Sequence, residues 1–260
     1  GLSPSIGVTL SPVPIEGLQF FGTYSEGFRP PTMREAMVSD ANAIPNWHLE
    51  PETTQSWEFG MNYLKDGVLF ERDKARLKIA YFHNYHDNYI SRVPSYAGGG
   101  QYAFTFTNLD HAMFEGLEVS GSYDTGVFFS NAALTYYTDY EFCFTTRCEA
   151  STVETDYAAN HIPPELSASV TLGLRLFEER LTLGSRITYN SERLAALTVS
   201  DRQRTAFWLP YTVVDAFATY KINDHLTLDV KGENLFDRYY VDALDGWMPA
   251  PGRTIRANLT

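Results

Sequence analysis

The stretch LSASVTLGLRL at residues 166–176 alternates strictly between apolar and polar side chains. Its even-numbered positions carry leucines, an alanine and a valine, whereas its odd-numbered positions carry serines, a threonine, a glycine and an arginine. Successive side chains of a β-strand point to opposite faces, so this pattern predicts a strand with one apolar face and one polar face. A helix would need a period near 3.6 residues, which the stretch does not show.

Three further segments near the end of the chain repeat this alternation. Residues 181–189 set leucines, an isoleucine and a tyrosine against threonines, a glycine and an arginine. Residues 226–233 and 254–259 follow the same pattern, with charged side chains among the polar positions. Neighbouring strands of this kind make a sheet with one apolar and one polar face, which is the usual form of antiparallel β structure.

Soluble β-sandwiches and lipocalin-like barrels alternate in the same way, so two other features separate them from a membrane barrel. Asp229, Lys231 and Glu233 fall on one strand face, which suits a wide, water-filled interior better than a narrow packed one. Aromatic residues also gather near the ends of the predicted strands, as in the interfacial girdles of membrane barrels. They include Phe20, Phe21, Tyr24, Tyr85, Tyr89, Tyr136, Tyr137, Tyr140, Trp208, Tyr211, Tyr239 and Tyr240.

The whole chain reads as eleven strands joined by connections of alternating length. We predict strands at 3–10, 16–28, 52–64, 74–92, 102–124, 127–140, 165–177, 180–192, 208–221, 225–237 and 252–260. The connections at one end are short, with 65–73 the longest of that set, and those at the other are long, at 29–51, 93–101, 141–164, 192–207 and 238–251. This asymmetry predicts an antiparallel transmembrane β-barrel. Single-chain bacterial barrels have even strand numbers, so eleven strands indicate part of one.

Composition excludes several other classes of protein. The 260 residues contain no apolar run of about 18, so a membrane-spanning helix is excluded. The net charge of −12 argues against a nucleic-acid partner. Cys143 and Cys148 have no second cysteine pair with which to build a zinc site, and in an oxidising compartment they would close a small disulfide loop. No signal peptide opens the chain and Gly1 is not an initiator, so we expect the start to be cut or processed.

Two segments at the end of the chain, GENLFDRYY at 232–240 and PGRTIRANL at 251–259, closely resemble the closing hairpin of TonB-dependent outer-membrane receptors. Members of that family form barrels of about 22 strands around an N-terminal plug. The resemblance implies that residues 1–260 are the C-terminal half of such a barrel, and that the plug and the TonB-binding segment lie outside this chain. It also implies a place in the bacterial outer membrane, TonB-coupled import, and no enzymatic activity.

The first half of the chain resembles haem receptors of this family. YSEGFRPP at 24–31 looks like the family's FRAP box, and PNWHLEPE at 45–52 looks like its NPNL box. RPPTMREAM at 29–37 and SWEFGMN at 56–62 are most similar to hemophore-type haem receptors. The resemblance implies haem as the transported ligand, a haem-carrier protein as a candidate partner, and no intrinsic cofactor. Loop 29–51 is then the expected ligand loop, and 141–164 and 192–207 are the expected contacts for a protein partner.

In haem receptors a histidine between the two boxes ligates the iron, but residues 32–45 contain none. His48, inside the second box, is the nearest imidazole, and neutral imidazole is a good iron ligand. We therefore predict His48 as the candidate iron ligand, with a second ligand on the plug. The alternative is a loop histidine that only hydrogen-bonds its neighbours. The remaining predicted ligand-binding residues are Arg29, Met33, Met37 and Trp47.

For three other polar side chains the strand pattern predicts only the face on which each one lies. His83 and His86 are three apart in a predicted strand, so they face opposite sides and cannot chelate one metal. Asp215 interrupts an apolar strand and should point inward, toward an arginine or lysine of a neighbouring strand.

Two rival functions remain open from the sequence. A ferric-siderophore receptor would use aromatic and arginine side chains in place of an axial histidine. A surface-binding barrel without transport would lack the TonB-binding segment. No serine-histidine-aspartate arrangement or phosphate loop suggests an enzyme.

Overall fold

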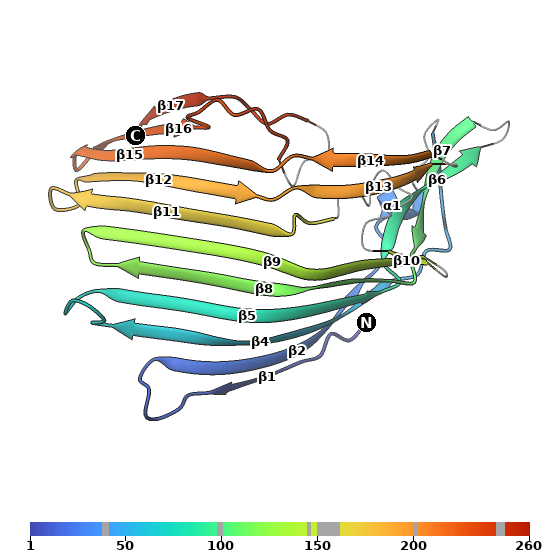
Figure 1. Cartoon of the computed structure of the whole chain (residues 1–260), viewed down its shortest axis with the longest axis horizontal. Helices are drawn as coiled ribbons and strands as arrows, with labels where there is room; N and C mark the ends of the chain where they lie inside the picture. The colour runs from blue at the N-terminus through green and yellow to red at the C-terminus, as the bar shows by residue number, and fades with distance from the viewer. Residues whose placement is uncertain (38–41, 98–100, 145–146, 150–161, 200–201, 243–247) are drawn as a thin grey trace.

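A broad antiparallel sheet makes up most of the molecule (Figure 1). A computed structural model describes residues 1–37, 42–97, 101–144, 147–149, 162–199, 202–242 and 248–260. The sheet has 12 strands, and eleven of them pair with one another in order along one path. The path is β1 (Ser5–Leu10), β2 (Leu18–Arg29), β4 (Glu52–Asp66), β5 (Lys74–Asp87), β8 (His111–Asp124), β9 (Phe128–Phe144), β11 (Leu166–Leu176), β12 (Leu181–Asn190), β15 (Tyr211–Asn223), β16 (Leu226–Glu233) and β17 (Thr254–Leu259), and β10 (Arg147–Glu149) pairs with β9.

The strand register carries the alternation seen in the sequence across the whole sheet. Val170 lies opposite Ala132 on one side and Ile187 on the other, so apolar side chains share a face. One residue along, Thr171 lies between Asn131 and Arg186 on the opposite face. The apolar face is open, and Leu172 is 45% exposed on it. A continuous exposed apolar face of this kind is typical of the lipid-facing surface of a transmembrane β-barrel.

The predicted shared face of the 166–176 strand is confirmed. Its even-numbered side chains, Leu166, Ala168, Val170, Leu172 and Leu174, follow one another without a register shift against either neighbour. Arg175 lies on the other face, where its guanidinium donates two hydrogen bonds of 2.9 Å to Asp124. Asp215 also lies on the polar face, opposite Arg186. Its carboxylate, however, accepts a hydrogen bond from the Asn234 amide at 2.9 Å.

The predicted strands are found within a few residues, but several expected loops contain strands. Residues 90–108 form a hairpin of β6 (Ile90–Ala97) and β7 (Gln101–Asn108), and residues 193–208 form another, of β13 (Arg193–Val199) and β14 (Arg202–Trp208). The stretches expected at 74–92 and 102–124 are strand for most of their length but are wrong as single strands, because β5 ends at Asp87 and β8 begins at His111. Asn88, at a φ of 55°, turns the chain away from the main sheet. β3 (Ala43–Ile44) pairs in parallel with β7, so the sheets are not wholly antiparallel.

The two ends of the sheet differ as predicted. The connections at one end are short turns, at 11–17, 67–73, 125–127, 177–180 and 224–225. The connections at the other end are long, and β6, β7, β10, β13, β14 and helix α1 (Met33–Met37) lie there, at the right of Figure 1. We call this the loop end. Within the described residues α1 is the only helix, and no helix there is long and apolar enough to cross a membrane.

A small core secures the loop end. It packs two side chains of long connections against three from β8, β9 and β14, namely Leu109, Ile162, Ala112, Phe142 and Trp208. Phe142 makes an edge-to-face contact with Phe114 at 5.4 Å between ring centroids. These contacts hold other long connections together at the loop end, outside the candidate ligand loop 29–51.

Candidate functional site

Arg29, the last residue of β2, fastens the first long connection to the sheet. The register of β2 and β4 places it opposite Glu52. Its Nη2 and Nε donate to the two carboxylate oxygens of Glu52, at 2.6 and 2.5 Å. Its Nη1 donates to both carboxylate oxygens of Glu35, at 2.9 and 3.0 Å. A bidentate pair between a guanidinium and a carboxylate fixes the orientation of both side chains in addition to neutralising their charges.

Glu35 closes the first turn of α1 in a capping box. The carboxylate of Glu35 accepts hydrogen bonds from the backbone amide and the hydroxyl of Thr32, at 2.7 and 2.9 Å. The Thr32 hydroxyl in turn accepts one from the Glu35 amide at 3.2 Å. This reciprocal arrangement is the usual start of a helix that begins Thr-x-x-Glu. Burial raises the pKa of Glu35, but the bonds from Thr32 and Arg29 outweigh burial and lower it.

Glu52 connects the first long connection to the second. It is only 6% exposed, and its Oε1 accepts a hydrogen bond from the Ile90 amide at 2.7 Å. Ile90 opens β6, where the chain leaves the main sheet. A buried carboxylate needs this full set of partners, since an unpaired one would be costly. Arg29, Glu35 and Glu52 therefore form one anchor at the base of the loop end.

The second half of the first connection is fixed to β7 by two asparagines. The Asn46 side chain donates to the Phe106 carbonyl at 3.0 Å and accepts from the His48 amide at 3.0 Å. The Asn108 side chain accepts from the Glu50 amide at 2.9 Å. It also donates to the Glu50 carbonyl, at 2.9 Å. The backbone of residues 45–50 is thus fixed from both sides.

Two of the predicted ligand-binding side chains lie on this fixed backbone, and two others lie on α1. Trp47 is 64% exposed, Met33 is 75% exposed on α1, and Met37 and His48 are also exposed. Arg29 differs from these side chains, because its Nε, Nη1 and Nη2 atoms all donate hydrogen bonds to Glu35 or Glu52. Arg29 is placed as a residue that positions the loop. Contact of any of the five with a ligand stays a prediction.

Sequence reasoning missed the residues that hold the site. Thr32 and Glu35 could have been found from the Thr-x-x-Glu spacing. Glu52 and Asn108 could not, because their roles depend on which strands become neighbours. Parts of the two loops predicted to contact a partner, at 145–146, 150–161 and 200–201, lie outside the described residues.

The other histidines lie where their spacing predicted. His83 and His86 fall on opposite faces, since the register places His83 opposite Glu115 and His86 opposite Thr54. His83 Nδ1 lies 3.2 Å from a Glu115 oxygen, and His86 Nδ1 lies 2.9 Å from the Thr54 hydroxyl.

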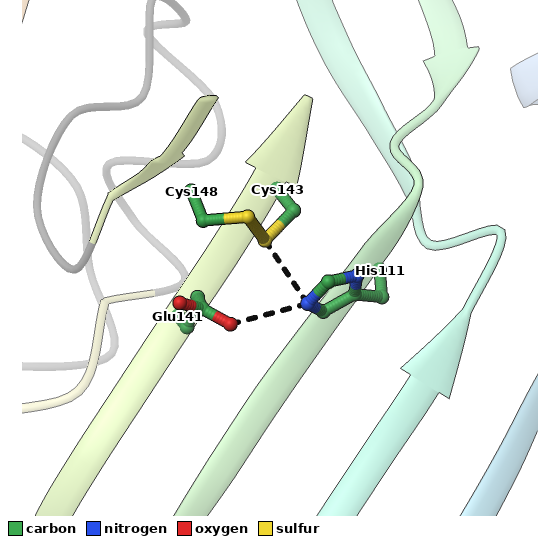
Figure 2. A group of neighbouring side chains, drawn as sticks. All are labelled: His111, Glu141, Cys143 and Cys148. Carbon is green, nitrogen blue, oxygen red and sulfur yellow. Dashed lines mark hydrogen bonds and ion pairs between the residues drawn. A yellow bond between two sulfur atoms is a disulfide. The ribbon is translucent and has the colours of Figure 1, made fainter. Parts of the chain in front are cut away.

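Cys143 and Cys148 are joined by a disulfide with an S–S distance of 2.09 Å. The bond links β9 to β10, and His111 of β8 and Glu141 of β9 lie beside it (Figure 2).

Comparison with known proteins identifies relatives over the whole chain. The family model described as TonB dependent receptor-like, beta-barrel, matches residues 1–235. The hemophilin receptor of Acinetobacter baumannii is 26% identical over 100% of this chain and 27% of its own length. A solved structure of a double mutant of the Serratia marcescens hemophore receptor HasR, in complex with its hemophore HasA and heme, is 27% identical. It superposes with a TM-score of 0.73 over 99% of this chain and 39% of that chain.

A siderophore receptor has the same fold. The siderophore receptor PirA from Acinetobacter baumannii superposes with a TM-score of 0.72 over 99% of this chain, at 17% identity. This likeness concerns the fold alone. The chain spans 27% of the hemophilin receptor and about two fifths of the two structures, 39% and 40%.

Proposed function

We propose, because the chain belongs to the TonB-dependent receptor β-barrel family, that it forms part of a bacterial outer-membrane receptor that binds and imports haem. The family consists of receptors and transporters, and the sheet is a partial barrel of its kind. The observation that carries the haem proposal is an exposed imidazole, His48, on a loop segment fixed to β7 by Asn46 and Asn108. Its position within a box resembling that of haem receptors supports the choice of ligand.

The loop end supplies binding chemistry. A neutral imidazole at His48 offers a nitrogen lone pair to ferric haem iron. Trp47 offers an exposed aromatic face, and Met33 and Met37 offer flexible, polarizable side chains, suited to the edge and plane of a porphyrin. Arg29, Glu35 and Glu52 hold the loop that carries these groups. A fixed loop loses little freedom when the ligand binds, and that favours affinity.

The remainder of the receptor completes the transport function. In this proposal residues 1–260 are the C-terminal half of the barrel, and an N-terminal plug with the TonB-binding segment belongs to the complete protein. The second iron ligand comes from that plug. TonB then draws on the plug after haem binds. Loops 141–164 and 192–207 contact a haem-carrier protein, a role supported by the hemophore bound in the HasR structure.

An uptake experiment tests the choice of cargo. A strain that lacks its own haem receptors is given the complete receptor and supplied with haem or with a ferric siderophore as its only iron source. We expect growth on haem that depends on TonB. Growth on the ferric siderophore but not on haem would replace this proposal with the siderophore alternative. Haem capture at the surface without TonB-dependent growth would favour a non-transporting surface-binding barrel.

A further inference from the structure

Four chemically reactive side chains meet at the loop end, on the face of the sheet opposite to His86. The register places His111 opposite Cys143, and Cys143 opposite Cys148. Glu141 lies two residues before Cys143 on β9 and so shares its face. One nitrogen, oxygen or sulfur atom of each of the four lies within 4.8 Å of the others (Figure 2). None of these residues belongs to the proposed haem loop.

The hydrogen-bond partners of His111 assign a proton to its Nε2. That nitrogen lies 3.1 Å from a Glu141 carboxylate oxygen and 3.0 Å from Sγ of Cys143. An ionised carboxylate and a disulfide sulfur can accept a hydrogen bond but cannot donate one. The Tyr85 ring stacks on the imidazole at 4.9 Å between centroids and fixes its plane. The Nε2 proton is therefore positioned beside one sulfur of the disulfide.

Negative charge surrounds this imidazole. Glu141 approaches from β9, Asp87 of β5 lies opposite His111 in the register, and Asp110 precedes it in the chain. An imidazolium is a better proton donor than an imidazole, and it stabilises an adjacent thiolate.

The two sulfur-bearing residues differ in access. Cys143 is only 2% exposed, whereas Cys148 is exposed. An incoming thiolate therefore meets Cys148 first, and the sulfur that must leave belongs to Cys143. A buried thiolate is unfavourable unless it receives a proton or a positive neighbour. The imidazolium form of His111 supplies one or the other from 3.0 Å.

We propose that Cys143–Cys148 is an exchange-reactive disulfide that small external thiols open at Cys148, with His111 as general acid. A thiolate RS⁻ bonds to Sγ of Cys148, and the bond between the two cysteines breaks. Its electron pair leaves on Sγ of Cys143, which takes the Nε2 proton of the His111 imidazolium and leaves that ring as neutral imidazole, and solvent then returns a proton to the ring. One disulfide replaces another, so the step has no net oxidation. A second RS⁻ can release Cys148 as a thiolate and leave RSSR.

Metal binding is a weaker explanation for the same four residues. Cysteine binds metal ions as thiolate. In the structure the two sulfurs are bonded to each other, so neither is a thiolate. The general-acid explanation needs only the arrangement that is present.

Glutathione is the probe for the experiment. The complete receptor in detergent is treated with glutathione, quenched with N-ethylmaleimide, and digested for mass spectrometry without reduction. We expect glutathione on Cys148 and N-ethylmaleimide on Cys143. The opposite distribution, with glutathione on Cys143, would overturn the proposed direction of attack.

Rates then test the role of His111. His111→Gln should slow the exchange about tenfold or more, because general acids typically contribute at least that much. The wild-type rate, divided by the thiolate concentration, should fall as pH rises, and this dependence should vanish in His111→Gln. His83→Gln is the matched control, since His83 also pairs with a glutamate on the same face but lies away from the disulfide. A variant that had lost its fold would expose both sulfurs and react faster, with both labelled. A His111→Gln rate equal to or above wild type, with glutathione on Cys148 alone as in the folded protein, overturns the proposal.

Discussion

Arg29 and Glu52 face each other across the β2–β4 ladder and form a two-bonded ion pair, at 2.5 and 2.6 Å, at the base of the candidate ligand loop. Glu52 is buried and also accepts the Ile90 amide, so the pair joins two long connections that are far apart in sequence. A hydrogen bond to a charged group contributes about 1.5 to 3 kcal/mol. The pair therefore fixes the loop end rather than only neutralising charge.

Glu52→Gln should loosen this junction without unfolding the barrel. The variant keeps the size of the side chain but removes the charge that holds Arg29 and weakens the acceptor for Ile90. Hydrogen exchange of the Ile90 amide in the complete receptor should become about 10- to 100-fold faster, as expected for the loss of about 1.4 to 3 kcal/mol. Arg34→Ala, on the exposed side of α1, should leave that rate unchanged. An unaltered Ile90 rate in Glu52→Gln would show that the anchor is not needed.

The anchoring of α1 should depend on pH through Glu35. The folded-state pKa of Glu35 is lowered below its ordinary value of 4.5. Its stabilising contribution is thus fully present above that value and is lost as pH falls through the lowered pKa. A spin label on Arg34→Cys should be restrained at pH 6 and become mobile in the acid range below pH about 4. Glu35→Gln should be mobile at both values, and equal restraint throughout would refute this dependence.

Asn108→Ala should show the effect of loop anchoring on haem affinity separately from the effect of iron ligation on the haem spectrum. It removes the side chain that accepts from the Glu50 amide and donates to the Glu50 carbonyl. We expect faster hydrogen exchange at Glu50 and weaker haem binding by several-fold, because a freed loop must be ordered again on binding. The position of the haem absorption band should not change, since His48 remains. Asn62→Ala, on the polar face within β4, serves as the control, and a shifted band in Asn108→Ala would contradict this division of roles.

Asp215→Leu should destabilise the closing hairpin. The Asp215 carboxylate accepts a hydrogen bond from the backbone amide of Asn234. The side-chain amide of Asn234 in turn donates hydrogen bonds to the backbone carbonyls of Arg238 and Pro251. Losing the acceptor leaves a buried amide unpaired, at a cost of about 1 to 3 kcal/mol. The folded band of the complete receptor in a heat-modifiability gel should therefore be lost at a lower temperature. Asp215→Asn keeps an acceptor oxygen and should lie between the variant and wild type.

The strands of the main sheet could be predicted because one apolar face and one polar face impose a strict two-residue period on the sequence. The hairpin at 90–108 was missed because Pro94 and the glycines at 98–100 are typical of loops. The hairpin at 193–208 was missed because its residues lack strict alternation. Both lie beyond the part of the sheet with one apolar and one polar face, so that period does not apply to them.

The site was predictable only in part for a different reason. His48, Trp47 and the two methionines follow from short motifs. The partners of Arg29 and His111 depend on register, and the register of β8 and β9 shifts between Glu115 and Gly116. A shift of that kind determines whether His111 meets Cys143, and nothing in the local sequence specifies it.

The most direct test of the account is an absorption titration of the complete receptor with ferric haem, in wild type and in His48→Ala. We expect wild type to bind haem with the band of a histidine-ligated iron, and His48→Ala to shift that band and bind more weakly. His225→Ala, which alters an exposed histidine at a short turn of the opposite end, should match wild type. Identical spectra and affinities for wild type and His48→Ala would contradict ligation by His48, and a wild-type receptor that binds no haem would contradict the proposed function itself.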